Sequence, residues 1–460
     1  MEDSSLDRAR DVATAVGRAG GRALVVGGWV RDRLLGREAK DLDIEVFGLT
    51  ADQLAALLTT MGRVEAVGES FQVFKLADID VSLPRRESKS GRGHRGFLVT
   101  GDPTMSVEEA ARRRDFTVNA ISWDPLSDSG DGYVDPFNGR ADLAARVLRA
   151  VDVSTFADDS LRVLRGVQFA ARFELVMDEP TRRLCRSIAL DDLAAERIWG
   201  EIDKLLAAPK PSIGFALARD LDIVSRLFPE LQALVGCVQE PEWHPEGDVW
   251  VHTLQVIDQA RIRVDDLPRP MRLAVMLGAV CHDFGKPATT AFVDGRIRSI
   301  DHEEQGVAPA TSFLDRLRVV TIEGYDVRAQ VLGMVAHHLK PGMWFKVRDE
   351  VGDGAFRRLA QKVDLELLAR LAKADCLGRE PGQFNCAAMD WFLERSRALG
   401  VEHRAPEPLV LGRHLLALGL SPGPRVGAIL KAIYDQQLDG RIRTVEEGVT
   451  AAANLIADGV

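Results

Sequence analysis

Apolar residues in the first third of the chain occur in short runs separated by glycines and polar turns, the pattern of a small sheet with helices. A compact apolar run at 23–26 precedes helical spacing at 30–35, and another apolar run follows at 42–46. Further strand candidates lie at 71–76, 79–83, 121–123 and 133–134. The pattern therefore predicts an α+β domain.

Two polar segments interrupt these elements. Residues 84–102 are rich in Arg, Ser, Gly and His and hold too little apolar surface to pack, so we expect a mobile loop. The stretch DPLSDSGDG at 124–132 combines Asp, Pro, Ser and Gly, which favours a hairpin turn between the strand candidates on either side.

The strand signals end near residue 141, and apolar residues then recur at three- and four-residue spacing, which predicts helices. Two prolines and several acids at 236–248 indicate a domain boundary, and APEP at 405–408 marks a small helical tail. After the α+β head we therefore expect all-α regions. The predicted domains are residues 1–145, 146–235, 236–400 and 401–460.

Composition excludes few classes of protein. The net charge of −10 counts against a nucleic-acid partner, although contact with phosphates needs only a local basic face, and arginines cluster at 112–114 and 162–172. The polar start and the lack of an apolar run near the roughly 20 residues of a spanning helix predict a cytoplasmic protein without a membrane partner. The five scattered cysteines argue against a disulfide framework, and Cys281 and Cys376 are expected to be small buried side chains.

Candidate chemistry in the head centres on GGWVRDRLLGREAKDLDIEV at 27–46. Gly27 and Gly28 lie between a strand and a helix start, where backbone can approach a triphosphate. Asp41 and Asp43 are two apart in a strand, so both carboxylates project from one face and can hold a pair of Mg²⁺ ions. Asp80 is the candidate for a third carboxylate, and Asp78 is its competitor.

This segment resembles the opening of the class II tRNA nucleotidyltransferases (CCA-adding enzymes) and bacterial poly(A) polymerases, which belong to the DNA polymerase beta-like superfamily. RRRDFTVNAI at 112–121 and VDPFNGRADL at 134–143 continue the resemblance. It implies a polymerase-beta-like head in which Arg31 contributes to nucleotide binding. It also implies that Arg114 and Asp115 hold the triphosphate and ribose.

A further stretch, DDSLRVLRGVQFAARF at 158–173, resembles the helix that reads the incoming base in that family. The resemblance implies that Asp159 and Arg162 present hydrogen-bond edges to the base, and that Arg165 adds to nucleotide binding. Asp158 and Gln168 depart from the family pattern, where Glu and Arg are usual. RRESKSGRGHRGF at 85–97 resembles the mobile loop of full CCA-adding members and favours addition of A.

A second set of motifs follows residue 236 and resembles the HD superfamily of metal-dependent phosphohydrolases. The motifs are WHPEGDVWVHT, CHDFGK, AHH and KADCLGR, at 243–253, 281–286, 336–338 and 373–379. The resemblance implies a divalent transition metal held by four side chains, namely His252, His282, Asp283 and Asp375. A second metal or the substrate phosphate would contact His302 and His337, with His338 as the alternative to His337.

The resemblance implies addition of CCA to tRNA 3′ ends from CTP and ATP, with Mg²⁺ in the head and phosphohydrolase activity in the HD domain. A poly(A) polymerase or an enzyme that adds only part of CCA is one alternative. An RNA-binding or repair phosphohydrolase with an inactive head is the alternative from another class. We expect no DNA partner, and one sequence leaves the oligomeric state open.

Overall fold

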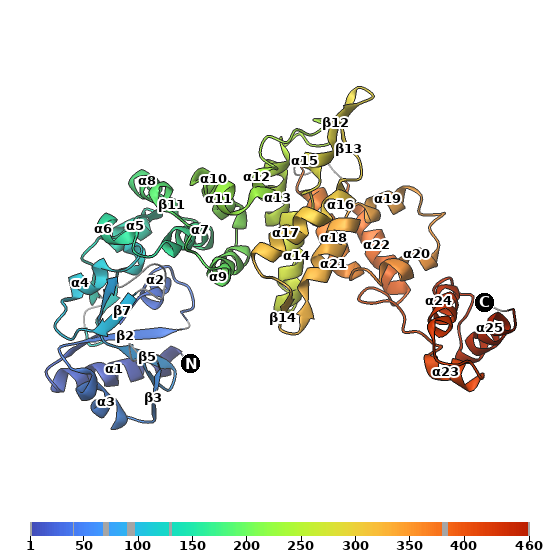
Figure 1. Ribbon diagram of the computed structural model, residues 1–460. Coiled ribbons are helices and arrows are strands. Elements are labelled where there is room, and N and C mark those ends of the chain that lie inside the picture. Colours follow the sequence, from blue (N-terminus) through green and yellow to red (C-terminus); the bar gives the residue numbers. More distant parts are fainter. Residues whose placement is uncertain are drawn as a thin grey trace. The chain divides into compact units, whose positions relative to one another are not determined.

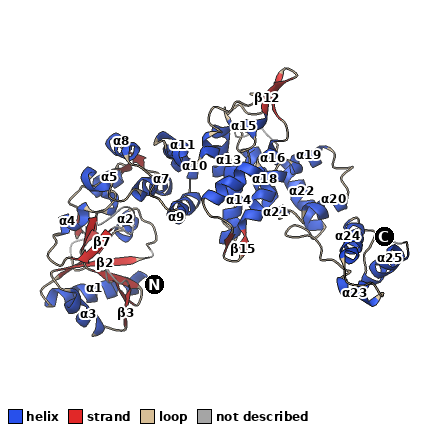
Figure 2. Ribbon diagram, viewed as in Figure 1, coloured by secondary structure: helices blue, strands red, loops and turns tan. Residues whose placement is uncertain are grey.

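The computed structural model describes residues 2–39, 41–67, 73–89, 97–127, 131–379 and 385–458. The chain forms two compact units, Met1–Arg226 and Leu227–Val460 (Figure 1). Strands of the larger sheet all belong to the first unit, and helices dominate the second (Figure 2). Within the described residues, every helix is too short or too polar to cross a bilayer. This arrangement confirms the predicted fold class.

A mixed sheet of seven strands forms the centre of the first unit, counted over its described residues, in the order β3-β4-β5-β2-β1-β8-β9. Strand β2 pairs in parallel with β5 and antiparallel with β1. The strands are β1 (Arg22–Val26), β2 (Leu42–Phe47), β3 (Val64–Val67), β4 (Val73–Leu76), β5 (Ile79–Ser82), β8 (Ser122–Trp123) and β9 (Tyr133–Val134).

Alternation along the strands gives the sheet two different faces. On β2, Leu42, Ile44 and Val46 are buried in one apolar cluster with residues of the first helix, Glu2–Arg18 (α1). The intervening positions of β2 point to the other face, where Phe47 joins a second cluster with Met105. Because side chains alternate, Asp43 and Glu45 lie on this second face. The polar site is therefore built on the face opposite α1.

The segment expected to be a loop at 84–102 contains two strands instead. Strand β6 (Arg85–Lys89) pairs antiparallel with β7 (Phe97–Gly101), and residues 90–96 lie outside the described part of the chain. The expectation of a loop was wrong at both ends because backbone hydrogen bonds form a ladder whatever the polarity of the side chains. The predicted hairpin of β8 and β9 is confirmed.

Helices follow the sheet and complete the first unit. Helix α7, which carries Arg162 of the predicted base-reading pair and the predicted nucleotide-binding Arg165, packs against α9 and α10. A short parallel pair, β10 (Val147–Leu148) and β11 (Val176–Met177), interrupts the predicted helices. The helices are α1 (Glu2–Arg18), α2 (Gly28–Leu34), α3 (Ala51–Thr59), α4 (Val107–Arg112), η2 (Thr117–Asn119), α5 (Gly139–Ala144), α6 (Val153–Phe156), α7 (Leu161–Phe173), α8 (Glu179–Ser187), α9 (Ala195–Leu206), α10 (Pro211–Asp220) and α11 (Ile223–Leu227).

The second unit is built on α14, which packs against α13, α18 and α21. Two small hairpins, β12 (Thr290–Val293) with β13 (Arg296–Ser299) and β14 (Thr321–Ile322) with β15 (Tyr325–Asp326), interrupt the predicted helices. The helices are α12 (Pro229–Gln232), α13 (Val249–Arg261), α14 (Arg269–Cys281), α15 (Lys286–Thr289), α16 (His302–Gln305), α17 (Val307–Arg316), α18 (Val327–His337), α19 (Lys340–Lys346), α20 (Asp353–Leu359), α21 (Leu365–Leu377), α22 (Ala387–Ala398), α23 (Gly412–Ala417), α24 (Pro424–Leu438) and α25 (Val445–Ala457).

The last three helices share their own apolar cluster, which includes Leu415, Ile429 and Ala452. Elsewhere in this unit a disulfide joins Cys376 to Cys386, which corrects the expectation that Cys376 is only a buried apolar side chain. Scattered spacing concealed this bond, because the pairing depends on how α21 and α22 meet rather than on a sequence motif.

Candidate functional site

The head carboxylates meet where two parallel strands run side by side. Asp43 on β2 is in register with Asp80 on β5, and neighbouring strands lie about 4.8 Å apart. Both residues line a cavity of about 930 Å³. Asp78 instead lies in the turn before β5, where it contacts Ser5 and Arg8 of α1. The structure therefore brings Asp80, rather than Asp78, to the side of Asp43.

Asp43 has an unusual charge environment. It is exposed to the cavity, but the surrounding walls remove enough of its hydration that burial raises its pKa to about 6. Arg114 opposes this rise, while the charges of Asp80 and Asp41 add to it. Asp41 is exposed just before β2 and does not line the cavity. A cluster of like charges of this kind is suited to a divalent cation.

Gly27 makes room for the groups around the carboxylates. Its φ of +77° is in the region that favours glycine, and a Cβ atom there would lie 3.0 Å from Nη1 of Arg114 and 3.9 Å from Oδ2 of Asp43. Gly28 begins α2 beside it, and both glycines line the cavity. Because residue 27 has no Cβ, there is room here for a ligand to approach the backbone closely.

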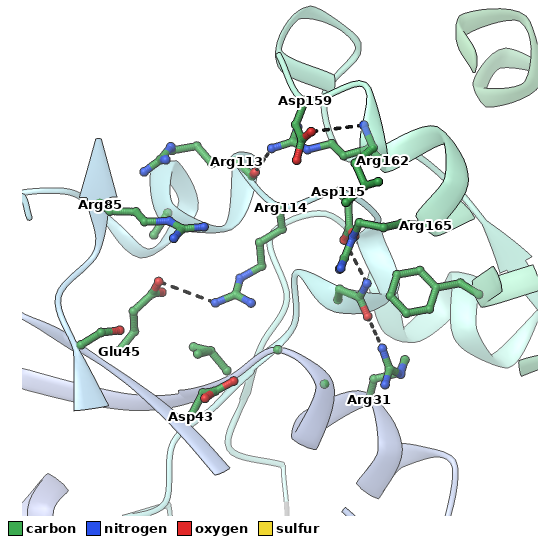
Figure 3. A pocket seen from close by; sticks show the side chains of 18 of the residues that line it. Arg31, Asp43, Glu45, Arg85, Arg113, Arg114, Asp115, Asp159, Arg162 and Arg165 are labelled. Carbon is green, nitrogen blue, oxygen red and sulfur yellow. Dashed lines mark hydrogen bonds and ion pairs between the residues drawn. The ribbon is translucent and has the colours of Figure 1, made fainter. Parts of the chain in front are cut away.

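Arginines form much of the opposite wall of the cavity. Figure 3 shows Arg114 extending toward β2, where its Nη2 lies 3.6 Å from Oε1 of Glu45. Arg165 reaches from α7 to the carboxylate of Asp115, with Nε 2.7 Å from Oδ2. The remaining arginines that line the cavity are Arg31, Arg85, Arg113, Arg162, Arg172 and Arg197. A cavity with this lining suits a polyphosphate.

Asp115 is the centre of a buried network. Its Oδ1 accepts hydrogen bonds from the backbone N–H of Phe116 and from Asn119, at 2.8 and 2.9 Å. Asn119 in turn accepts from Arg31 at 2.6 Å. Although burial opposes the charged form, Arg165 and Asn119 hold the pKa of Asp115 below its usual value. Asp115 is therefore a charged anchor for two of the predicted nucleotide-binding arginines.

The predicted base-reading pair is held by other groups. Asp159 receives Nη2 of Arg197 at 2.9 Å from both carboxylate oxygens. Arg162 donates to the backbone carbonyls of Thr155 and Arg113, at 3.0 and 2.7 Å. Asp159, Arg162 and Arg197 all line the cavity. Arg197 was not predicted. It lies on α9, which packs against α7, and the only signal for it in the sequence is a basic residue in a helical stretch.

Imidazoles and carboxylates converge in the second unit. Nε2 of His252 on α13 lies 3.0 Å from Oδ1 of Asp375 on α21. Asp283, after α14, approaches Nε2 of His282 at 3.2 Å through Oδ2 and Nε2 of His302 at 3.4 Å through Oδ1. The structure therefore brings together His252, His282, Asp283, His302 and Asp375, as predicted.

The remaining histidine of the cluster is His338, not the predicted His337. Nε2 of His338 lies 3.2 Å from Nε2 of His302, and burial together with His302 and His282 lowers the pKa of His338 to about 3. His337 is the last residue of α18 and its side chain is outside the cluster. The two residues are adjacent, so only the direction in which the helix end turns decides which imidazole enters.

The cluster fits a divalent cation by its own chemistry. Nε2 of His282 is buried and makes no hydrogen bond to any described residue. Among the described residues, three triplets each place ligand atoms within 4.8 Å of one another: His252 with His282 and Asp283, Asp283 with His302 and His338, and, beside them, His244 with Glu246 and His252. Although burial opposes it, electrostatic interactions with His282 and Lys286 hold the pKa of Asp283 well below its usual value. Neutral imidazoles and ionised carboxylates are metal-ligating forms.

Known proteins match the chain along most of its length. Residues 23–149 match the family described as poly A polymerase head domain, 176–234 the probable RNA and SrmB-binding site of polymerase A, and 249–379 the HD domain. A multifunctional CCA protein of Xanthomonas oryzae pv. oryzae is 36% identical over 422 residues, which cover 88% of this chain and 95% of that protein.

The chain belongs to this family of CCA-adding nucleotidyltransferases with a C-terminal HD domain.

Solved structures of the family share its fold. The CCA-adding enzyme of Bacillus stearothermophilus in complex with CTP has a TM-score of 0.63 and 19% identity, with 97% of each chain covered. The Thermotoga maritima CCA-adding enzyme complexed with tRNA has a TM-score of 0.56 and 19% identity, covering 98% of this chain and 95% of that one. The predicted family membership is confirmed.

Several residues beside the HD cluster escaped sequence analysis. Lys286, within the quoted CHDFGK motif, places Nζ 2.8 Å from Oδ2 of Asp283 and donates to Gln239 at 2.6 Å. Glu246, in WHPEGD, lies 2.8 Å from Nδ1 of His252. Both belong to motifs that sequence analysis quoted, and their proximity in sequence to predicted ligands was the available signal.

Proposed function

We propose that the chain adds CCA to tRNA 3′ ends from CTP and ATP and releases pyrophosphate. The observation that carries this proposal is the register of Asp43 and Asp80, which stand in one cavity with Arg114 and the Asp159–Arg162 pair. The relatives named multifunctional CCA protein support it, because their similarity extends over both the head and the HD region. The proposed place of reaction is the cytoplasm.

In the proposed reaction the 3′-hydroxyl of tRNA attacks the α-phosphate of the nucleotide. A bond forms between O3′ and the α-phosphorus, and the bond to the β-phosphate breaks to release pyrophosphate. Asp41, Asp43 and Asp80 would hold Mg²⁺, which when bound lowers the cost of the developing charge on the phosphate oxygens. Arg114 and the other arginines of the cavity wall would bind the triphosphate.

Selection between C and A is assigned to Asp159 and Arg162. A carboxylate accepts from the exocyclic amino group of either base, and a guanidinium donates to ring acceptors. To meet a base, Arg162 would exchange at least one of its bonds to the carbonyls of Thr155 and Arg113. The choice of base would then depend on which edge these two side chains present.

The test uses tRNA that lacks CCA, Mg²⁺ and single labelled nucleotides. Incorporation of both C and A supports the proposal, while A alone indicates a poly(A) polymerase or an A-adding enzyme, and C alone a CC-adding enzyme. Absence of any addition indicates an inactive head on an RNA-binding or repair hydrolase. Asp43→Ala should abolish addition and leave any HD activity intact.

A second activity, hydrolysis of phosphoesters by the HD domain, is favoured by the cluster of imidazoles and carboxylates. A divalent transition metal bound there would polarise the phosphoester and make water a better nucleophile. Lys286 lines the adjacent cavity and would contact a phosphate oxygen. Asp283→Ala should remove phosphatase activity and preserve nucleotide addition; loss of both activities in either folded variant would contradict two separate sites.

A further inference from the structure

The histidines of the HD cluster are oriented in a common way, with one exception. Nδ1 of His282, His302 and His338 lies 2.8 to 2.9 Å from a backbone carbonyl three residues earlier, that of Ala279, Ser299 and Val335 respectively. In each ring, Nε2 therefore faces the cluster. His252 also turns Nε2 toward the cluster, but its Nδ1 faces a side chain, Glu246, at 2.8 Å.

Glu246 is buried, with its side chain 1% exposed. Its Oε1 accepts a hydrogen bond from Nδ1 of His244 at 2.8 Å and forms an ion-pair contact at the same distance with Nδ1 of His252, which makes no hydrogen bond to any described residue. The segment that carries it is fixed by Asp248, which caps α13 through the backbone N–H of Val251 and accepts a hydrogen bond from the N–H of Gly236 at 2.6 Å. The position of Glu246 is thus set by the start of the helix that carries His252.

His252 lies between two carboxylates that compete for its proton. Glu246 faces Nδ1, whereas Asp375 faces Nε2 at 3.0 Å. A neutral ring carries one proton, and its other nitrogen offers the lone pair that a metal requires. If the proton stays on Nδ1, Nε2 is available to a cation. If it moves to Nε2, the ring donates to Asp375 and the lone pair points away from the cluster.

We propose that Glu246 is a positioning residue of the HD site: it keeps the proton of His252 on Nδ1, so that Nε2 is free for a divalent cation. This inference rests on the proposed HD activity, because it assumes that the cluster binds a metal. Carboxylates that accept from a ligating histidine raise metal affinity in this way. The backbone carbonyls do the same for the other three histidines, so His252 is the one whose support a substitution can remove.

His244 provides an internal comparison, because it shares Oε1 of Glu246. It lines the cavity above the cluster, and its ring meets that of His252 edge to face, with centroids 4.8 Å apart. Removing His244 leaves the contact of Glu246 with His252 in place. His244→Ala should therefore keep metal affinity, whereas the proposal is wrong if His244→Ala weakens metal binding as much as His252→Ala does.

The first experiment titrates Co²⁺ into chelator-treated full-length protein and follows binding by calorimetry and visible absorption. Glu246→Leu removes the acceptor, and Glu246→Gln keeps the shape without the charge. We expect the Leu variant to bind Co²⁺ about 10- to 100-fold more weakly and the Gln variant to lie between it and the wild type. Glu242, on the same segment and paired with Arg296 on the surface, provides the matched control, because Glu242→Leu should bind as the wild type does.

Unchanged affinity in both Glu246 variants would overturn the proposal. Thermal unfolding of each variant reports whether the unit that carries the HD cluster, Leu227–Val460, is folded, and the Gln variant keeps the test valid if the Leu variant does not fold. If the wild-type HD site binds no Co²⁺, the proposed HD activity fails instead, and the second experiment still decides the role of Glu246.

The second experiment reads the proton on the ring directly. Full-length protein labelled with [¹⁵N]histidine is examined by ¹H–¹⁵N correlation at alkaline pH, where the ring is neutral, and His252→Gln identifies the signal. The wild type should carry the proton on Nδ1, and Glu246→Leu should carry it on Nε2. A purely structural role would lower thermal stability and leave the tautomer unchanged, and that result, or a wild-type proton on Nε2, would refute the proposal.

Discussion

Asp43 and Asp80 stand opposite each other on parallel strands, and this register selects Asp80 over Asp78 as the third candidate carboxylate of the head, after Asp41 and Asp43. Ile44 and Val81, the next residues in the same register, are buried on the other face of the sheet. Burial of these apolar neighbours therefore forces both carboxylates into the cavity. A shift of one residue in the pairing of β2 with β5 would expose apolar residues such as Ile44 and Val81. Their burial therefore fixes the register that places Asp43 beside Asp80.

The first prediction distinguishes Asp80 from Asp78. Asp80→Asn should lower the rate of nucleotide addition by roughly 100-fold or more, because it removes a charge that we assign to Mg²⁺. Asp78→Asn should leave the rate within about twofold, because it disturbs only exposed contacts with Ser5 and Arg8, and the pair with Arg8 contributes about 1 kcal/mol or less. Single-turnover addition of labelled CTP measures both. Equal losses of rate in the two variants would indicate that Asp78 also contributes to the site.

The second prediction concerns pH. Because the pKa of Asp43 is raised to about 6, protons compete with Mg²⁺ below that pH, and Mg²⁺ affinity of the head should fall about tenfold per pH unit there. Affinity should level off above about pH 7. Folding stability without Mg²⁺ changes with pH in the opposite direction to Mg²⁺ affinity. The folded state holds this proton more tightly than the unfolded state, so the contribution of Asp43 to stability is lost as pH rises from its ordinary value through about 6.

Mg²⁺ titrations of nucleotide binding between about pH 5 and about pH 8 measure the effect. The same titrations with Asp43→Asn remove the titrating group and should show a weak, pH-independent affinity. A wild-type affinity that does not change through pH 6 would contradict the role of Asp43 as a ligand.

The third prediction tests the space at Gly27. Gly27→Ala should nearly abolish addition, because the new Cβ would lie 3.0 Å from Nη1 of Arg114. Gly36→Ala is the control for a glycine with positive φ: its φ of +66° also favours glycine, but no atom lies within 4 Å of the new Cβ. Thermal unfolding should show the larger loss for Gly27→Ala, whose backbone angles of φ 77° and ψ −136° disfavour alanine, and at a temperature where both variants are folded only Gly27→Ala should lose activity. Equal activities would show that the backbone does not limit access at Gly27.

The fourth prediction assigns Arg197 to the support of Asp159. Arg197→Ala should weaken discrimination between CTP and ATP about 10-fold, because the Asp159 carboxylate loses a charged partner on both oxygens. Arg183→Ala, which changes an exposed arginine of α8, should leave discrimination unchanged. The ratio of kcat/KM for the two nucleotides provides the measurement. A ratio unaffected by Arg197→Ala would mean that Asp159 does not need this partner.

Most of the fold followed from periodicity, and the failures have a local cause. The hairpin at β6 and β7 was missed because RRESK, the sequence of β6, has no apolar position that a period of two could mark, whereas a backbone ladder needs none. The small hairpins of the HD unit were missed for a related reason: two to four residues per strand are too few for a period of two to be recognised.

Of the head site, Gly27, Asp43 and Arg114 were predicted and line one cavity, whereas Asp41 was predicted and does not line it, and Arg197 lines it but was not predicted. Arg197 meets Asp159 across 38 positions of sequence. The partner of a charged side chain depends on how helices α7 and α9 pack, and no spacing rule within either helix reports that distance. The residue types of the site could therefore be predicted from the sequence, but the side chains that contact them could not.

The sequence by itself determined the family, the fold class and the residue types at both sites, because those depend on motifs and on side-chain alternation within single elements. Only the tertiary structure decided that Asp80 joins Asp43, that His338 enters the HD cluster in place of His337, and that Glu246 meets His252. These choices depend on strand register, on the turn at a helix end and on packing between distant segments. All three are set by burial of the common core, which no short stretch of sequence contains.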